Sequence, residues 1–246
     1  MDKIAVISDI HGNIPALEAV LDHIEKQDIQ KVFCLGDLVG KGPESKESIN
    51  RIRSACQKTV KGNWDDFIIK ETEFETLKWH QAQLDQEDEA YLANLPFSID
   101  FIMSGKSIRL FHASPFSIYT RVQPWDSVEK RVSMFENTAM TGFENKIPDI
   151  VGYGDVHQAF VQHFFGKTLF NSGSVGNPLD LPQASYAVLE GIFDAETPEP
   201  FSIQLVRVPY NIEQSITIAR QMDMPDLEPY IKELKTSRYR GLKEDV

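Results

Sequence analysis

Side chains that commonly bind metals follow three apolar segments in the N-terminal part of the chain. Asp9 and His11 come directly after the first segment, Asp37 after the second and Asn63 after the third. If these segments are parallel strands, the side chains meet at the carboxyl edge of one sheet, where open α/β sheets bind their ligands. A mixed set of carboxylate, imidazole and amide donors suits divalent ions such as Mn, Fe or Zn.

Two more histidines, His112 and His157, also follow apolar segments, and Asp155 stands two residues before His157. Each motif alone is a weak signal, because Asp, Asn and Gly are also ordinary turn residues. Their repeated position at strand ends is what indicates a metal site. The remaining histidines lack that position and are interpreted as surface or structural residues. They are His23, His80 and His163.

The elements that must position these residues are predicted from hydrophobic patterning. Residues 3–8 and 31–35 are continuous apolar segments typical of buried strands, and residues 58–60 form a short third strand. Residues 13–27 and 43–55 lie between them and carry apolar side chains at helical spacing. This strand–helix order predicts a parallel sheet with right-handed crossovers.

The rest of the chain carries hairpin signals, in which two β segments flank a short turn or loop. The expected pairs are 98–103 with 107–111, 159–165 with 168–170, and 186–193 with 201–208. Further helices are expected at 127–137, 211–222 and 226–235. Because no repeat or flexible linker interrupts this pattern, we predict one domain over residues 1–246.

Residues 64–95 are mostly polar and helix-compatible, and we predict a helical insertion that rests on one edge of the core. Between Glu71 and Glu89 the segment has seven acidic residues and one lysine, which gives it a charge of −6. That is half of the net charge of −12, which results from 25 Lys and Arg against 37 Asp and Glu. Charge runs of this kind usually form a solvated helix face.

The ordered motifs resemble those of the calcineurin-like metallophosphoesterases. The matching segments are Asp9-Ile10-His11, Gly36-Asp37, Gly62-Asn63-Trp64-Asp65, His112, Gly154-Asp155-Val156-His157 and residues 171–178. The resemblance spans roughly residues 4–178 and is closest to the small bacterial phosphodiesterase branch, which is similar to dinucleoside polyphosphate hydrolases. It implies an α/β fold, a four-layer α/β/β/α sandwich with the helical insertion at about 64–95.

The resemblance also implies a site for two metal ions between the sheets. The implied ligands of the first ion are Asp9, His11, Asp37 and His157. Asp37 would bridge to a second ion, which Asn63 and His112 would also bind. The ions would be Mn and/or Fe, with Zn or Ni as alternatives, and together they would activate a hydroxide for attack on phosphorus. Asp37, Asn63 and His112 are therefore the expected catalytic residues.

Three positions depart from the family pattern. Trp64 replaces a histidine that assists the leaving group, and Asp155 replaces a histidine of the second metal. We keep Asp155 as a metal ligand, because a carboxylate can bind Mn or Fe. Lys41 replaces an arginine of the phosphatases and would contact phosphate as a point charge. Lys41, Trp64 and Asp65 form the expected substrate-binding set.

The lack of a histidine at Trp64 bears on the substrate. A general acid contributes roughly 10²–10⁴-fold, and its loss affects poor leaving groups most. The sequence therefore favours phosphodiesters or nucleotide phosphoanhydrides, such as dinucleoside polyphosphates, although Asp65 or Asp66 could supply the proton instead. Two alternatives stay open: a serine/threonine phosphoprotein phosphatase, and a degenerate metal-binding regulatory module without turnover.

Composition limits the other classes of function. The acidic balance and the lack of a basic block argue against binding long nucleic acids or anionic membranes through bulk charge. Two cysteines, Cys34 and Cys56, make no disulfide framework, and no signal peptide or membrane-spanning segment is recognised. We expect a cytoplasmic protein whose partner is a small phosphorylated or nucleotide substrate, with its oligomeric state open.

Overall fold

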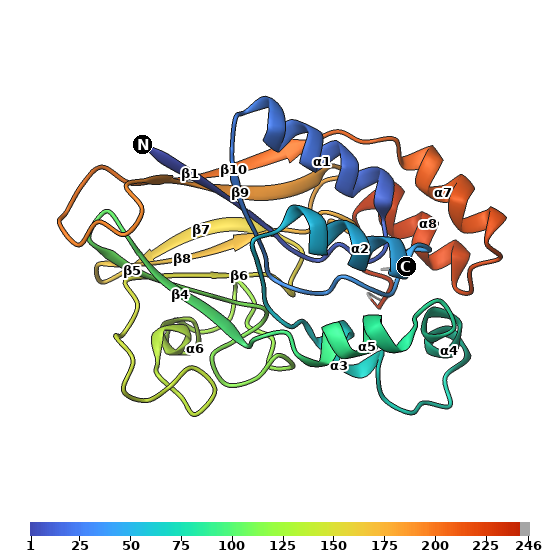
Figure 1. Cartoon of the computed structure of the whole chain (residues 1–246), viewed down its shortest axis with the longest axis horizontal. Helices are drawn as coiled ribbons and strands as arrows, with labels where there is room; N and C mark the ends of the chain where they lie inside the picture. The colour runs from blue at the N-terminus through green and yellow to red at the C-terminus, as the bar shows by residue number, and fades with distance from the viewer. Residues whose placement is uncertain (242–246) are drawn as a thin grey trace.

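The computed structural model describes residues 1–241, so the last five residues of the domain expected at 1–246 lie outside the described part. One of its two five-stranded sheets has the order β10-β9-β1-β2-β3 (Figure 1). These strands are β1 (Asp2–Ile7), β2 (Lys31–Cys34), β3 (Lys58–Thr59), β9 (Ala184–Gly191) and β10 (Ser202–Val208). The first three are parallel, as predicted, while β9 and β10 run antiparallel.

The second sheet has the order β4-β5-β6-β8-β7. Its strands are β4 (Ser98–Met103), β5 (Lys106–Phe111), β6 (Ile150–Tyr153), β7 (Ala159–Phe164) and β8 (Lys167–Ser172). Strands β5, β6 and β8 are parallel, and β4 and β7 are antiparallel edge strands. The three predicted hairpins, β4–β5, β7–β8 and β9–β10, are confirmed.

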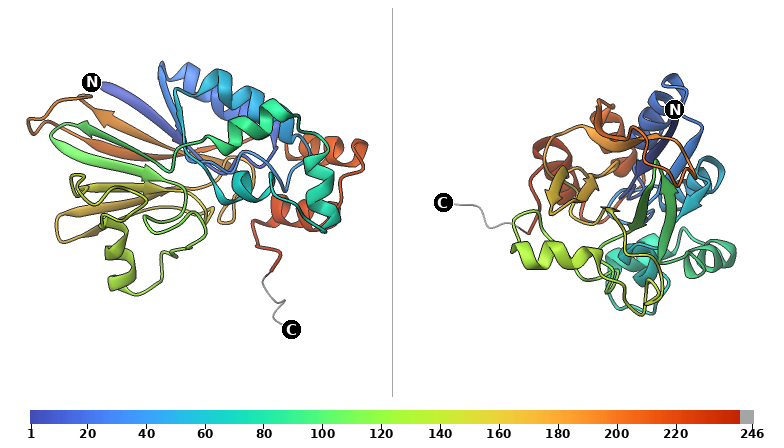
Figure 2. Two further views of the ribbon diagram at one scale, coloured as in Figure 1. Left: turned by 60° about the horizontal axis from the view of Figure 1, so that its bottom comes forward. Right: turned by 90° about the vertical axis from the view of Figure 1, so that its left-hand side faces the viewer.

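The two sheets pack face to face between helices, which confirms the four-layer arrangement (Figure 2). Helices α1 (Ile14–Lys26) and α2 (Ser45–Ala55) cover the first sheet. Strand β1 is apolar because its alternate residues point to opposite faces of the sheet and both faces are buried. Ile4 and Val6 pack between the sheets, while Ala5 and Ile7 lie in the core beneath α1.

The layer outside the second sheet is thin. It consists of α6 (Val128–Val132), a 3₁₀ turn η1 (Ser133–Phe135) and the loops around them. The helix predicted at 127–137 therefore ends early, and Ser133 closes it by donating its hydroxyl to the carbonyl of Lys130. Met134 and Phe135 of the turn supply the apolar cover for this face.

The acidic segment forms three short helices rather than one continuous helical region. They are α3 (Asn63–Phe67), α4 (Glu75–Gln81) and α5 (Gln86–Ala93). Its charge is not entirely solvated, because α2 supplies cations to it. Lys46 contacts the carboxylates of Asp85 and Asp88, and Arg53 contacts Glu87 at 2.7 Å. These ion pairs help to hold the segment against the first sheet's helices.

Two helices complete the fold at the end of the molecule toward which β1 runs (Figure 1). They are α7 (Ile212–Gln221) and α8 (Leu227–Thr236), and each end lies one residue from its predicted position. Helix α7 contacts α1, and Trp79 of α4 packs against the apolar side of this helix pair. No helix in residues 1–241 has the length and apolarity to span a bilayer.

Candidate metal centre

The loops that follow five parallel strands converge at one edge of the two sheets, as the strand order requires. Strands β1, β2, β3, β5 and β6 are followed respectively by Asp9 and His11, Asp37, Asn63, His112, and Asp155 and His157. Except for Asn63, which is partly buried, all of these residues are buried. The structure thus brings all seven predicted metal ligands to one end of the molecule, although they do not all play the same part there.

Three imidazoles are fixed in the same way. The Nδ1 atoms of His11, His112 and His157 lie 3.0, 2.8 and 2.5 Å from the backbone carbonyls of Val39, Leu35 and Asn177. Because a carbonyl oxygen only accepts, each Nδ1 carries a proton, and each ring in its neutral form offers a lone pair on Nε2. All three Nε2 atoms therefore face the site as potential metal ligands.

Asp9, His11 and His157 form one group that could hold a cation, which we call the histidine-rich group. The Nε2 atoms of its two histidines are 3.2 Å apart, and Asp9 Oδ1 lies 3.2 Å from the Nε2 of His157. Asp9 Oδ1 is buried and has no hydrogen-bond donor within the described chain. Two facing lone pairs and an unpaired carboxylate oxygen are unfavourable together unless a cation lies between them.

Asp9, Asp37 and His112 form a second candidate group, the carboxylate-rich group. Asp37 Oδ1 is 3.4 Å from His112 Nε2, and its Oδ2 is 3.6 Å from His11 Nε2. The two oxygens of Asp37 thus face the two groups. The side-chain oxygen of Asn63 lies 2.9 Å from His112 Nε2, which places it beside the same group.

Burial and mutual contact shift the pKa values of these residues. Burial together with the carboxylates of Asp9 and Asp65 raises the pKa of Asp37 well above its usual range. Burial opposes protonation of His112, but the charges of Asp37 and Asp9 outweigh it and raise the pKa of His112 to about 9. Burial, with Lys41 nearby, lowers the pKa of His11 well below its ordinary value. The site therefore concentrates negative charge that a cation would relieve.

The backbone at the site adopts the left-handed conformation repeatedly. Asp9, His11, Asp37, Asp155 and His157 have φ values between 49° and 62°. Residues with a side chain rarely occupy this region, although Asp, Asn and His tolerate it better than others. Such strain is typical of sites where surrounding packing fixes functional side chains.

Two glycines allow the strand ends to approach each other. A Cβ on Gly62 would lie 2.1 Å from Asp37 Oδ1, and a Cβ on Gly154 would lie 2.0 Å from the hydroxyl of Ser8. Any larger residue at either position would displace a loop that carries a candidate ligand.

Asp155 has a different environment from the other candidate ligands. Its carboxylate forms a bidentate ion pair with Arg121, with distances of 2.9 and 2.8 Å, and it lies outside both cation-holding groups. Its backbone contacts the two groups, since the amide of Asp155 donates a hydrogen bond to Asp9 Oδ2 at 3.1 Å. The carboxylate of Asp155 is thus paired outside the two groups, and its role as a metal ligand stays a prediction.

Asp65 is also placed differently from the expectation that it binds substrate. Its carboxylate is fully buried and accepts hydrogen bonds from the backbone amides of Asp37, Leu38 and Gly62, at 2.8 to 2.9 Å. These bonds tie the loop after β2 to the loop after β3. Asp65 thus positions the loop of Asp37 from beneath, without facing the open side of the site.

The open side is a cavity of about 500 Å³, which we call the site cavity. Its lining includes Lys41, Trp64, Asp155 and His157, so two of the three expected substrate-binding residues face it. The indole of Trp64 packs on Gly40 and meets the ring of His11 edge-on at 5.8 Å. The ammonium of Lys41 donates to Asn177 Oδ1 at 3.0 Å.

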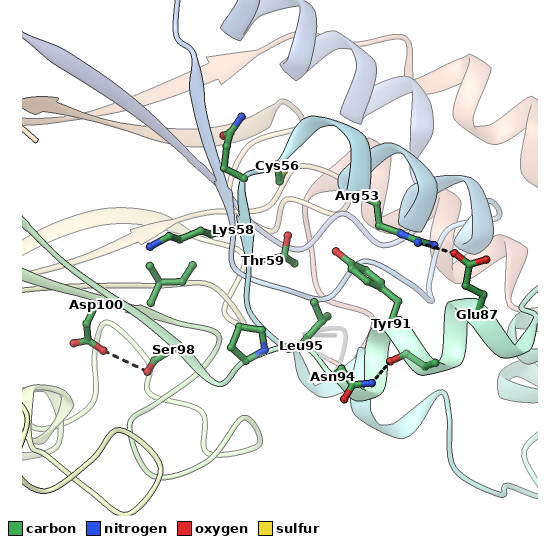
Figure 3. A pocket seen from close by; sticks show the side chains of 14 residues that line it. Arg53, Cys56, Lys58, Thr59, Glu87, Tyr91, Asn94, Leu95, Ser98 and Asp100 are labelled. Carbon is green, nitrogen blue, oxygen red and sulfur yellow. Dashed lines mark hydrogen bonds and ion pairs between the residues drawn. The ribbon is translucent and has the colours of Figure 1, made fainter.

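A larger groove of about 910 Å³ lies elsewhere, between β3, α5 and β4 (Figure 3). It is lined by residues such as Arg53, Tyr91 and Asp100, and none of its lining residues belongs to either cation-holding group. Its size alone therefore does not make it the reaction site.

The structure adds three residues to which the sequence assigned no role in the site: Glu233, Asn177 and Arg121. Glu233 of α8 is fully buried and accepts from Asn177 Nδ2 at 3.2 Å. Asn177, in turn, accepts from both His157 and Lys41. Asn177 lies within the matching segment 171–178, and its tertiary contacts show that it also supports a candidate ligand. Arg121 was missed for the same reason, since it is distant in sequence from Asp155.

The chain is similar to several known proteins. Residues 2–191 match the family described as the calcineurin-like phosphoesterase superfamily domain. An uncharacterized protein of Methanocaldococcus jannaschii is 31% identical over 242 residues, covering 86% of this chain and 89% of its own length. The chain is also similar to the crystal structure of a metallophosphoesterase from Sphaerobacter thermophilus, with 25% identity and a TM-score of 0.75, covering 96% of this chain and 99% of that one. A hypothetical protein from Pyrococcus horikoshii shares the fold at 22% identity and a TM-score of 0.77, covering 95% and 98% of the two chains.

Proposed function

Since the chain belongs to the calcineurin-like phosphoesterase superfamily, we propose that it is a metal-dependent phosphoesterase. The observation that carries the proposal is the convergence of three Nε2 atoms on two carboxylates, Asp9 and Asp37. Two divalent ions would neutralise phosphoryl charge there and lower the pKa of water enough for attack on phosphorus. Mn or Fe is the proposed metal, and the cytoplasm is the proposed location.

The residues of the two groups would have separate roles in binding the ions. His11 and His157 with Asp9 would hold one ion, and His112 with Asn63 would help to hold the other. Asp37 faces both groups, which supports a bridging role for its carboxylate. Lys41 lines the site cavity beside Asn177, where its charge would attract the phosphate group.

The proposed substrates are phosphodiesters or nucleotide phosphoanhydrides, including dinucleoside polyphosphates. Neither carboxyl group that could replace the missing histidine is free to do so. Asp65 is buried under backbone amides, and Asp66 contacts Lys70 and the hydroxyl of Tyr119. A leaving group that needs no proton is therefore favoured, because no general acid is provided at Trp64.

A panel of four substrates tests the proposal. Metal-stripped protein is reconstituted with Mn²⁺ and given nitrophenyl phosphate, bis-nitrophenyl phosphate, diadenosine tetraphosphate and a phosphoserine peptide. We expect turnover of the diester and the dinucleotide above that of the monoester and the peptide. Preference for the peptide would contradict the proposed substrate class, and no turnover at all would contradict the proposed activity.

A metal-binding module without turnover is the second candidate, and one observation favours it. The carboxylate of Asp155 is held by Arg121 and lies outside the carboxylate-rich group. Metal analysis separates the two candidates. One tightly bound ion per chain with no hydrolysis of the panel supports the module, while two ions with hydrolysis support the enzyme.

A further inference from the structure

The chain after α8 turns back toward the site. Ser237 ends the helix with a left-handed φ of 53°, and the following residues, Arg238, Tyr239 and Arg240, line the site cavity. The hydroxyl of Ser237 is buried without a hydrogen-bond partner among the described residues. We call residues 237–240 the C-terminal segment.

A buried acid anchors the C-terminal segment to the metal centre. Glu233 Oε1 accepts from the backbone amide of Arg240 at 2.9 Å, and its Oε2 accepts from the guanidinium of Arg240 at 2.8 Å. The same Oε2 accepts from Asn177, whose carbonyl accepts from the candidate ligand His157. The position of the segment is therefore linked to the position of a metal ligand through a single side chain.

Positive charge gathers in the site cavity although the chain is acidic overall. Among residues 1–241, the cavity is lined by four cations, Lys41, Arg121, Arg238 and Arg240, and by one acid, Asp155. Arg121 pairs with Asp155, and Arg240 pairs with Glu233. Lys41 and Arg238 form no ion pair within residues 1–241. Two positive charges are thus available for a ligand in addition to the metals.

Aromatic side chains share this cavity with the cations. Trp64 lies at its metal side, and Trp125 and Tyr239 are 68% and 44% exposed. Exposed aromatic rings beside spare cations suit a ligand that is both planar and multiply charged, because rings stack on bases while cations bind phosphates. A volume of about 500 Å³ is within the range of small-molecule sites.

From these observations we infer that the C-terminal segment selects the substrate: Arg238 binds a phosphate beyond the one that is cleaved, and Tyr239 stacks on a nucleobase. The preferred substrate would then be a nucleotide with at least two phosphates. This inference rests on the proposed function for its reaction, but it can be tested by binding alone.

Binding of three ligands to the metal-loaded full-length protein tests the inference. The ligands are AMP, the β,γ-imido analogue of ATP, and tripolyphosphate, measured by calorimetry. Arg238→Ala should weaken the ATP analogue and tripolyphosphate about tenfold, and AMP less, because a charge-assisted contact to the second phosphate is lost. Tyr239→Ala should weaken the ATP analogue severalfold while tripolyphosphate binding changes little.

Matched variants distinguish the loss of a specific contact from misfolding of the protein. Arg238→Lys should restore part of the affinity for the ATP analogue and tripolyphosphate. Tyr239→Phe keeps an aromatic ring and should bind the ATP analogue as the wild type does. Arg220→Ala removes an exposed arginine from α7 that does not line the site cavity, so its binding should match the wild type. Equal effects of Arg238→Ala and Arg220→Ala would overturn the role of Arg238, and equal losses for all three ligands would overturn the selectivity.

Hydrolysis assays then separate this inference from the proposed function. If the wild type hydrolyses none of the panel but the variants change binding as expected, the proposed activity fails and the binding role of the segment stands. If the wild type is active but Arg238→Ala raises KM for diadenosine tetraphosphate and bis-nitrophenyl phosphate by the same factor, the segment is not the selecting element.

Discussion

The two candidate metal groups share Asp9, but their surroundings differ. In the histidine-rich group, both imidazoles are fixed by backbone carbonyls and face an unpaired carboxylate oxygen. In the carboxylate-rich group, Asp37 already accepts from the backbone amide of Trp64 at 2.8 Å, and the carboxylate of Asp155, which lies outside the group, is held by Arg121. The donors of the histidine-rich group are thus free to bind an ion, whereas Asp37 already has a backbone partner and the carboxylate of Asp155 is paired elsewhere.

Two candidate metal positions that share a carboxylate can therefore differ in their surroundings. Affinity depends on which donors are left free by their other partners, and the residues around a ligand decide that. We therefore expect the two ions to bind unequally, with the weaker position limiting activity. The following predictions test that inequality.

Asp37→Asn should have the largest effect, because Asp37 faces both groups. We expect hydrolysis to fall about 10³-fold or more while the melting temperature stays close to the wild type, since burial already disfavours the charged carboxylate. Steady-state kinetics and calorimetry measure the two quantities. The control is Asp22→Asn on the exposed side of α1, and retained activity in Asp37→Asn would refute the bridging role.

Asp65→Asn should reduce stability rather than metal affinity. An amide at this position would direct its NH₂ group toward backbone donors that now bond to the carboxylate, which should cost about 2–3 kcal/mol of unfolding free energy. Urea unfolding measures the loss. The neighbouring Asp66→Asn removes an ion pair with Lys70 at the surface and should cost under about 1 kcal/mol. Equal losses would contradict the structural role of Asp65.

Removal of metal should proceed in two steps if the groups are unequal. We expect increasing chelator to release one ion at a concentration at least about tenfold below that needed for the other, with activity lost in the first step. Metal analysis of dialysed samples, paired with activity, follows both steps. His112→Gln should abolish the step at low chelator, because it removes a donor of the carboxylate-rich group. His11→Gln should abolish the step at high chelator, because it removes a donor of the histidine-rich group. Simultaneous release of both ions would show that the two groups bind metal with similar affinity, contrary to this prediction.

Asp155→His should have the smallest of these effects, and it should increase the affinity for metal rather than decrease it. It removes the partner of Arg121 and offers a neutral donor at a position where φ is 62°, which histidine tolerates. The weaker ion should then bind severalfold, up to about tenfold, more tightly. Isothermal titration with Mn²⁺ measures the affinity. Asp155→Asn is the matched control, since it also frees Arg121 but adds no strong donor, and equal affinities would exclude a ligand role for residue 155.

The positions of the site residues were predictable from sequence because they depend on local order. A ligand directly after a buried strand must lie at the carboxyl edge of the sheet, and this applies to Asp9, Asp37 and His112 alike. The hairpins and the last two helices were predictable for a similar reason, since turn residues and apolar periodicity are local signals.

The partners of these residues were not predictable, because they come from distant segments. Asp65 was assigned to substrate by its place after Asn63, yet its carboxylate bonds to amides 27 and 28 residues earlier in the chain. Arg121 reaches Asp155 across 34 residues, and Glu233 reaches Asn177 across 56. No pattern in the sequence specifies such distances.

The left-handed backbone of the site also limits how the centre can evolve. Where φ is near 55°, branched or bulky side chains are strongly disfavoured, so the residues accepted at Asp9, His11, Asp37 and His157 come mainly from a short set: Asp, Asn, His and Gly. Three members of that set offer a metal donor or a near mimic of one. Single substitutions therefore tend to exchange one donor type for another, which alters the preferred ion, while the fold that holds it stays unchanged.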